Sequence, residues 1–376
     1  MAQGLLGLSL LSPFAGHLRA ISLDNWSSPT ANSGSGINLL GVTFAKNLFV
    51  AVGEQGMILT SADGSNWVKQ VSGTTIRLRS VSFGKGQFIA VGGDAAPNIN
   101  RIVLTSSNGL NWVTQSYTVE ISLGDVTFGN GTFVAVAGGF TSDILTSTNA
   151  SNWTVRATVS GLLTSAIFAS NNFVIVGNSI QTSRDGITWS NRFSASQSLR
   201  GIVYGRGLFV GVGDGTPSLF VVSKDGTNWT GTTPLATGNL KSVDYDNSYF
   251  VGVGGGGAIV SSPDGTNWVN RSSGSTSVLR AISHGNSRFV AVADGGTILQ
   301  SGLTAPILTG RPSPVPGYFE VSIYADTGRT YTLEATTNFV NWTPIFSFPA
   351  SNNPTVVSIS PGNVPLPRRF FRVSAP

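Results

Sequence analysis

A motif of fixed spacing recurs six times in this chain. In each copy a Ser is followed two residues later by Asp or Asn, and four residues after that by Trp. The copies are Ser61/Asp63/Trp67, Ser106/Asn108/Trp112, Ser147/Asn149/Trp153, Ser183/Asp185/Trp189, Ser223/Asp225/Trp229 and Ser262/Asp264/Trp268. Successive Trp residues lie 45, 41, 36, 40 and 39 positions apart. Because a period of this length is typical of one supersecondary unit per repeat, the sequence predicts a ring or stack of copies.

Each copy contains four short runs of strand-forming residues. The first is apolar with a leading Leu, as in 78–83, and the third ends at the Ser of the motif, as in 57–61. The Trp opens the fourth run. The second run starts with an aromatic residue in seven places: Phe49, Phe88, Phe133, Phe173, Phe209, Phe250 and Phe289. Four such runs separated by Gly, Asn and Asp turns predict one four-stranded antiparallel blade, so we expect an all-β, seven-bladed propeller.

The seventh unit is incomplete. It runs through three strands over 279–301 and reaches Gly302 without an Asp or a Trp. The missing part is found near the N-terminus, in Asp24-Asn25-Trp26. Trp26 lies 41 residues before Trp67, which is the usual spacing of the repeats. We therefore expect an N-terminal strand to complete the seventh blade and to close the ring, which removes a free sheet edge. In the alternative, residues 18–22, which match 279–283, are the remnant of an extra blade.

Composition and the placement of Pro and Gly divide the chain into four segments. Residues 1–21 form an apolar N-terminal arm or the remnant of a signal sequence, and 22–304 form the propeller. A Pro-rich linker is expected at 305–317, followed by a small, sandwich-like C-terminal β domain at 318–376. Charged residues make up only 10% of the chain, and Cys is absent, which excludes disulfides and thiolate zinc sites.

Each part of the pattern Ser-x-Asp-Gly-x-x-Trp has a physical role. The Asp or Asn can accept hydrogen bonds from backbone N–H groups of a tight turn, and the Trp ring can pack as a large apolar surface between neighbouring blades. The pattern resembles the Asp-box, or bacterial neuraminidase repeat, of sialidases and of the photosystem II assembly factor propeller. In those families the box is a structural turn away from the catalytic face. The resemblance thus implies a structural role for Asp63, Trp67, Asn108, Trp112, Asn149, Trp153, Asp185, Trp189, Asp225, Trp229, Asp264 and Trp268.

A second resemblance concerns the end of the chain. Residues 331–338, 341–343 and 369–373 are similar to the β domain that ends many exported proteins of environmental Gram-negative bacteria. This resemblance implies an extracytoplasmic location, either secreted or at the cell surface of a bacterium.

Catalytic residues are not apparent. A sialidase-type site needs an arginine triad, a Tyr paired with Glu and an acid/base Asp, yet the chain has only Glu54, Glu120, Glu320 and Glu334, and the last two lie in the C-terminal domain. A glycosidase pair remains conceivable, because Glu54, Asp94, Asp214 and Asp294 all follow second strands and could gather on one face. Since Asp-Gly is also an ordinary turn dipeptide, we expect no enzyme. With only His17 and His284, we also expect no metal site and no cofactor.

A basic feature stands at an equivalent position of the repeats. The residue after the leading Leu is a cation in four of seven units: Leu40, Arg79, Gly124, Thr164, Arg200, Lys241 and Arg280. If the first strand is innermost, these positions form a circle around the central channel. We therefore predict that Arg79, Arg200, Lys241 and Arg280 bind an acidic polysaccharide or a carboxylate-bearing protein partner. In the alternative, these side chains bind carbonyls of the next blade or lie along the surface.

Other partners are less well supported by composition. The net charge is +5, but only 22 of 376 residues are Lys or Arg and they form no run, so we expect no nucleic-acid binding. No apolar run is long enough for a membrane-spanning helix.

Two functions remain, a non-catalytic binding propeller and a structural subunit of an extracellular assembly. The second would form a homo-oligomer or homopolymer through the N-terminal arm or through exposed strand edges of the C-terminal domain.

Overall fold

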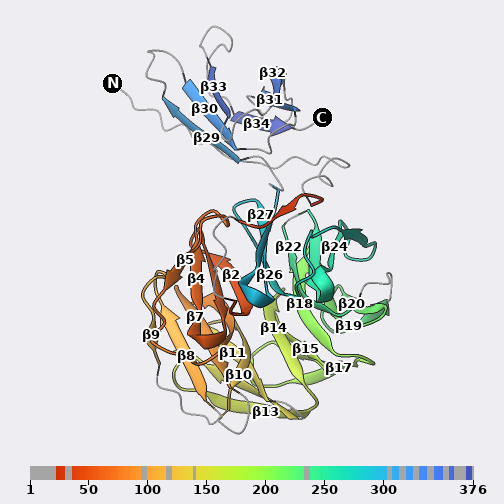
Figure 1. Ribbon diagram of the computed structural model, residues 1–376. Coiled ribbons are helices and arrows are strands. Elements are labelled where there is room, and N and C mark those ends of the chain that lie inside the picture. Colours follow the sequence, from red (N-terminus) through yellow and green to blue (C-terminus); the bar gives the residue numbers. More distant parts are fainter. Residues whose placement is uncertain are drawn as a thin grey trace. The chain divides into compact units, whose positions relative to one another are not determined.

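The computed structural model describes residues 23–29, 36–94, 100–115, 121–138, 141–232, 238–246, 248–302, 307–312, 319–324, 330–336, 343–349, 355–359 and 370–374. One compact unit spans Asn25–Ser301 and contains seven four-stranded antiparallel sheets arranged around a common centre (Figure 1). The expected all-β, seven-bladed propeller is therefore confirmed. Strands are joined in three blades by 3-10 turns, η1 (Glu54–Gly56), η2 (Gly255–Gly257) and η3 (Asp294–Gly296).

The blades are numbered 1 to 7 along the chain, and each is given from its innermost to its outermost strand. Blade 1 has β2 (Leu39–Ala45), β3 (Leu48–Gly53), β4 (Ile58–Ser61) and β5 (Val68–Gln70); blade 2 has β6 (Leu78–Gly84), β7 (Gln87–Gly93), β8 (Arg101–Ser106) and β9 (Val113–Thr114); blade 3 has β10 (Leu123–Gly129), β11 (Thr132–Gly138), β12 (Thr141–Ser147) and β13 (Thr154–Ser160). Blade 4 has β14 (Leu163–Ala169), β15 (Asn172–Gly177), β16 (Ser179–Ser183) and β17 (Ser190–Ser194); blade 5 has β18 (Leu199–Gly205), β19 (Leu208–Gly215), β20 (Ser218–Ser223) and β21 (Thr230–Thr232). Blade 6 has β22 (Leu240–Tyr245), β23 (Phe250–Gly254), β24 (Ile259–Ser262) and β25 (Val269–Arg271); blade 7 has β26 (Leu279–Gly285), β27 (Arg288–Ala293), β28 (Ile298–Ser301) and β1 (Trp26–Ser27).

The ring is closed by β1, which comes from the opposite end of the propeller sequence. It pairs antiparallel with β28 through Trp26 opposite Ser301 and Ser27 opposite Gln300. The Ser28 hydroxyl adds a hydrogen bond to the Ile298 carbonyl at 3.2 Å. The N-terminal segment therefore completes the seventh blade as predicted. The N-terminal arm at 1–21 and the match at 18–22 lie outside the described residues.

Aromatic side chains form the repeated core of the blades. The Phe that opens each second strand is fully buried in all seven blades. Each of these rings contacts an aromatic residue near the end of the first strand, for example Phe44 with Phe49 at 4.5 Å between centroids and Phe128 with Phe133 at 4.7 Å. Tilted ring pairs at this distance add stabilisation beyond the burial of their apolar area. The repeated Phe thus explains why each short blade folds on the same plan.

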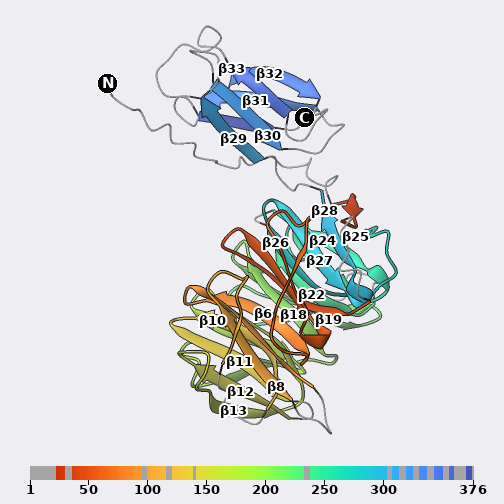
Figure 2. The same cartoon turned by 60° about the vertical axis from the view of Figure 1, so that its left-hand side comes forward.

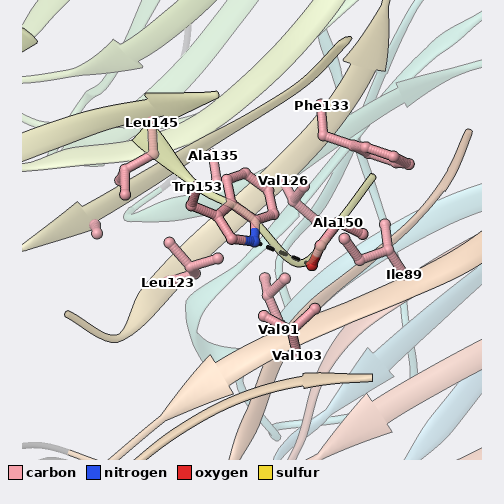
Figure 3. Close-up of a cluster of buried hydrophobic side chains, with 11 residues drawn as sticks. Ile89, Val91, Val103, Leu123, Val126, Phe133, Ala135, Leu145, Ala150 and Trp153 are labelled. Carbon is pink, nitrogen blue, oxygen red and sulfur yellow. Dashed lines mark hydrogen bonds between the residues drawn. The ribbon is translucent and has the colours of Figure 1, made fainter. Parts of the chain in front are cut away.

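The motif Trp packs between neighbouring blades. Trp153 of blade 3 is buried in a cluster with Ile89, Val91 and Val103 of blade 2 (Figure 3). Its indole N–H donates to the carbonyl of Ala150 at 3.1 Å, so the polar edge of the ring is satisfied within its own turn. Contact across the seam between blades is the role that we predicted for these Trp residues.

The Ser-Asp-Trp motif itself is a tight turn between the third and fourth strands. Asp63 Oδ1 accepts the backbone N–H groups of Ser65 and Asn66, both at 2.8 Å, and the Ser61 hydroxyl at 3.0 Å. Gly64 follows with a φ of 78°, a left-handed conformation that favours Gly. Asn108 makes the same backbone contacts through its amide oxygen, at 2.9 and 3.0 Å. All of these contacts are local, which fits a structural turn.

The motif turn of each of two blades also accepts a hydrogen bond from the preceding blade. Lys46, at the tip of the hairpin between β2 and β3, donates to the Ser107 carbonyl of blade 2 at 3.0 Å. Lys85 donates likewise to the Thr148 carbonyl of blade 3 at 2.9 Å. These hairpins and motif turns share one face of the propeller, because first and third strands of a blade run in the same direction. We call it the turn face.

The described part of the C-terminal segment contains two three-stranded antiparallel sheets (Figure 2). One has the order β29 (Ile307–Pro312), β30 (Phe319–Tyr324) and β33 (Thr355–Ile359), and the other has β32 (Thr343–Pro349), β31 (Thr330–Thr336) and β34 (Phe370–Ser374). Strand β29 falls inside 305–317, where the sequence predicts a linker. It pairs with β30 along its whole length, from Ile307 opposite Tyr324 to Pro312 opposite Phe319. Pro312 can end this strand because β29 lies at the edge of its sheet, where a residue without an N–H group is tolerated.

Candidate ligand-binding ring at the central channel

The seven innermost strands line a central cavity of about 300 Å³. All seven positions that follow the leading Leu border it: Leu40, Arg79, Gly124, Thr164, Arg200, Lys241 and Arg280. The structure thus brings Arg79, Arg200, Lys241 and Arg280 to one cavity. We call these four residues the cation ring.

A β-bulge sets the position of every ring residue. In all seven blades the pairing of the first and second strands skips one residue, as between Leu78 and Ser80 or between Leu199 and Gly201. The skipped residue is the one after the leading Leu. A bulge bends the strand and redirects the side chain of the extra residue. The sequence shows the repeat but not the bulge, because no single residue type occupies all seven bulges.

Small residues follow the bulge because the strands converge there. The next residue in each blade is Gly41, Ser80, Asp125, Ser165, Gly201, Ser242 or Ala281. A Cβ atom at Gly201 would lie 2.9 Å from the Cα of Ser242, and one at Gly41 would lie 3.0 Å from the Arg79 carbonyl oxygen. Asp125 is the only bulky residue in this layer.

Carboxylates at the ends of the second strands face the cation ring. Asp214 accepts from Arg200 Nε at 2.8 Å and from Lys241 Nζ at 2.9 Å, so it joins blades 5 and 6. Asp294 binds Arg280 through two parallel bonds, at 2.8 Å from Nε and 2.7 Å from Nη2. Burial alone would raise the pKa of Asp214, but the bonds from Arg200 and Lys241 outweigh it and hold that pKa below its usual range. The carboxylates that we considered as a glycosidase pair therefore serve largely as counter-ions.

Arg79 differs from the other three cations. Its Nε donates to the Gly93 carbonyl at 3.2 Å, and no carboxylate of the described residues lies within ion-pair distance of it. The adjacent Arg77 pairs with Glu54 at 3.1 Å, and Arg77 Nε is buried without a hydrogen-bond partner among the described residues. Burial, and then the positive charge of Arg77, lower the pKa of Arg79 from its usual value. The negative charges of Asp94 and Glu54 oppose this shift through space, so Arg79 has carboxylates nearby but none in an ion pair.

The charges of this site nearly balance. Arg77 and the cation ring contribute five positive charges, and the carboxylates Glu54, Asp94, Asp214 and Asp294 contribute four negative ones. Asp125 is a fifth carboxyl group on the cavity, and burial raises its pKa. The alternative expectation was a bond to a carbonyl of the next blade; Arg79 does bind a carbonyl, but that of Gly93 in its own blade. The four predicted cations are thus not all free to bind a ligand, since the second-strand ends place carboxylates in ion pairs with Arg200, Lys241 and Arg280.

Other kinds of site were sought in the described residues. They contain no group of three or more His, Asp or Glu side chains that could hold a metal ion. Within the same residues no helix is long and apolar enough to cross a membrane.

Comparison with known proteins identifies the fold. No protein-family model matches the chain, and no curated protein sequence matches it. Among solved structures, YCF48 bound to D1 peptide has a TM-score of 0.58 at 18% identity and covers 74% of this chain and 94% of its own. YCF48 from Cyanidioschyzon merolae has a TM-score of 0.56 at 18% identity, covering 73% of this chain and 98% of its own. The WD40 propeller domain of Doa1 has a TM-score of 0.55 at 11% identity, covering 74% of this chain and 97% of its own. At these identities the similarity shows that residues 25–301 form a propeller.

Proposed function

We propose that this protein is a non-catalytic binding propeller whose cation ring holds carboxylate groups of a protein partner. The observation that carries the proposal is the convergence of Arg79, Arg200, Lys241 and Arg280 on one cavity, each redirected by a β-bulge. Packing of the blades does not require four cations at these positions, since Leu40, Gly124 and Thr164 occupy the equivalent sites in blades 1, 3 and 4.

Two parts of the ring can accept an anion. Arg79 has no carboxylate partner in the described residues, and the adjacent guanidinium of Arg77 adds to its field. Across the channel, Arg200 and Lys241 share the single charge of Asp214, which leaves one positive charge there. The two parts favour a ligand with at least two carboxylates, because one could pair with Arg79 and the other with the Arg200 and Lys241 side of the ring.

A protein partner is favoured over an acidic polysaccharide for one structural reason. The cavity is small, about 300 Å³, and its size suits a carboxylate on a slender Asp or Glu side chain or at a chain terminus better than one on a bulky sugar ring. The YCF48 propeller of similar fold was solved with a peptide.

An Asp-box propeller with an export-type C-terminal domain would meet such a partner outside the bacterial cytoplasm, and we include that location in the proposal.

The test uses a fluorescent ten-residue poly-Glu peptide as a probe of carboxylate binding, with polygalacturonate as competitor. We expect Arg79→Ala to weaken peptide binding about tenfold at 50 mM NaCl, a change of about 1.4 kcal/mol. The matched control is Lys85→Ala, which removes one positive charge from the turn face and should alter affinity less than about twofold because exposed distant charges are screened. Equal losses in the two variants, or none in Arg79→Ala, would refute the proposal, and stronger binding of polygalacturonate would favour a polysaccharide ligand.

A further inference from the structure

The cation ring has a gap, because blades 3 and 4 carry Gly124 and Thr164 at the ring position. Arg79 and Arg200 lie on either side of this gap. No ion pair of the described residues spans it, whereas Asp214 bridges blades 5 and 6 directly. Something else must therefore fix the separation of Arg79 from Arg200 if both cations are to bind one ligand.

A continuous series of hydrogen bonds crosses the gap, and Asp125 is at its centre. Ser80, the residue after Arg79, donates its hydroxyl to Asp125 Oδ1. Asp125 Oδ2 accepts the backbone N–H of Ala166 in blade 4 at 2.8 Å. One carboxylate in blade 3 thus contacts both neighbouring blades.

The series continues from blade 4 to blade 5. Thr164 Oγ1 lies 2.7 Å from the carbonyl oxygen of Leu199, the residue before Arg200. Thr164 occupies the bulge of blade 4, two residues before Ala166. The bonds therefore run from the neighbour of Arg79, through Asp125 and the first strand of blade 4, to the neighbour of Arg200.

The site around Asp125 is uncharged apart from that carboxylate. Its other contacts are the Val126 N–H at 2.9 Å and the Ser165 side chain. Every other residue in this layer of the channel is Gly, Ser or Ala. A carboxylate is well suited to the position because its two oxygens can accept donors from opposite directions. A Ser here would reach only one neighbouring blade.

We propose that Asp125 is a positioning residue for the ligand site: it holds the strands that carry Arg79 and Arg200 at the separation a two-carboxylate ligand requires. This inference rests on the proposed function, since it concerns affinity for the same ligand. Asp125 borders the same cavity, but both of its carboxylate oxygens are engaged by Ser80 and Ala166. Thr164 takes part as the second link of the same series.

The test measures the affinity of the poly-Glu peptide for variants of the full chain, each confirmed to be folded by circular dichroism. Asp125→Ala should weaken binding about threefold to tenfold, the range expected for coupling through one network. Asp125→Asn should recover most of the loss, because its oxygen can accept from Ala166 while its amide donates to Ser80. Thr164→Val, of similar volume, should weaken binding in the same direction. If Asp125→Ala does not fold, the Asn and Val variants carry the test.

A matched control distinguishes positioning from general stability. Asp244 also joins two blades, accepting the His284 N–H of blade 7 at 2.6 Å, but the ring cations of these two blades, Lys241 and Arg280, already have carboxylate partners. Asp244→Ala should therefore lower stability and leave affinity unchanged. In the Arg79→Ala background, the effect of Asp125→Ala should largely disappear.

The outcomes separate the two proposals. If Arg79→Ala binds normally, the proposed function fails. If Arg79→Ala loses affinity but Asp125→Ala and Thr164→Val do not, only the positioning role fails. An Asp125→Ala loss that persists in full in the Arg79→Ala background would equally overturn that role, because the residue would then act independently of the cation.

Discussion

Replacing Asp214 by Asn is expected to change stability and ligand affinity in opposite directions. Asp214 accepts from Arg200 and Lys241, and its side chain is 23% exposed. An Asn side chain at this position has the same shape but no charge, so two cations would face each other without a counter-ion. The ion pairs hold the fold together, whereas the cations they occupy are the groups that would bind a ligand.

The loss of stability follows from the two ion pairs. Partly exposed pairs contribute up to about 1 kcal/mol each, so the free energy of unfolding should fall by about 1–2 kcal/mol at pH 7. For a domain of this size the midpoint of thermal unfolding should fall by about 2–4 °C per kcal/mol. The loss should vanish in acid. The pKa of Asp214 is lowered in the fold, so its stabilising effect is present above the unfolded value of about 3.9 and is lost as pH falls through the lower folded value.

The gain in affinity follows from Coulomb's law. One additional positive charge about 6 Å from a ligand carboxylate contributes about 0.7 kcal/mol in water and more in a partly shielded cavity. Asp214→Asn should therefore bind the poly-Glu peptide about threefold to tenfold more tightly at 50 mM NaCl, a gain that 500 mM NaCl should largely abolish.

The matched variant is Asp225→Asn, which makes the same change of charge at a motif turn on the other face. It should leave peptide affinity unchanged, because that charge is distant and exposed. Fluorescence anisotropy and differential scanning calorimetry of the same samples give both quantities. Tighter binding in both variants would show that net charge alone matters, and weaker binding in Asp214→Asn would mean that Asp214 is part of the ligand contact, either of which refutes the reasoning.

Three further predictions concern the scaffold. Asp264→Asn should leave the free energy of unfolding nearly unchanged, because Asn108 and Asn149 already make the same backbone contacts at their turns. Asp264→Ala should lower it by about 1 kcal/mol, as measured by urea unfolding, and equal losses in the two variants would contradict this. Trp153→Phe should cost about 1–3 kcal/mol, since it leaves a cavity and removes the bond to Ala150, and a change below about 0.5 kcal/mol would contradict the packing account. Burial raises the pKa of Asp244 to about 7, so the free energy of unfolding should decline as pH rises from about 4 to 7. This decline should be smaller in Asp244→Asn. If the free energy of unfolding depended on pH in the same way in both proteins, the raised pKa of Asp244 would be refuted.

The sequence predicts the scaffold well because each blade repeats the same residues. The leading Leu and the Phe of the second strand are buried in every copy, and the motif Trp is buried or half-buried. Closure of the seventh blade by Trp26 was predictable for a similar reason, since the N-terminal segment supplies the part that 279–301 lacks.

The site was only partly predictable, because its geometry depends on contacts between repeats. The circle of cations follows from spacing alone, but the pairing of Asp214 with both Arg200 and Lys241 joins two blades and has no signal in either repeat. Asp125 was recognisable in the sequence only as a carboxylate outside the motif. Its contacts with Ser80 and Ala166 span 45 and 41 residues, and they arise from the curvature of the ring. A signal was nevertheless present, since Asp125 is the only charged residue at its repeat position.

The central claim is that the charge of the ring, and not the charge of the whole protein, determines the ligand. Arg79→Glu and Lys85→Glu test it most directly, because both lower the net charge from +5 by the same two units on opposite faces. We predict that Arg79→Glu loses measurable binding of the poly-Glu peptide at 50 mM NaCl, while Lys85→Glu binds within about twofold of the unmodified protein, because charges beyond a Debye length are screened. Equal affinities of the two variants for the peptide would contradict the account.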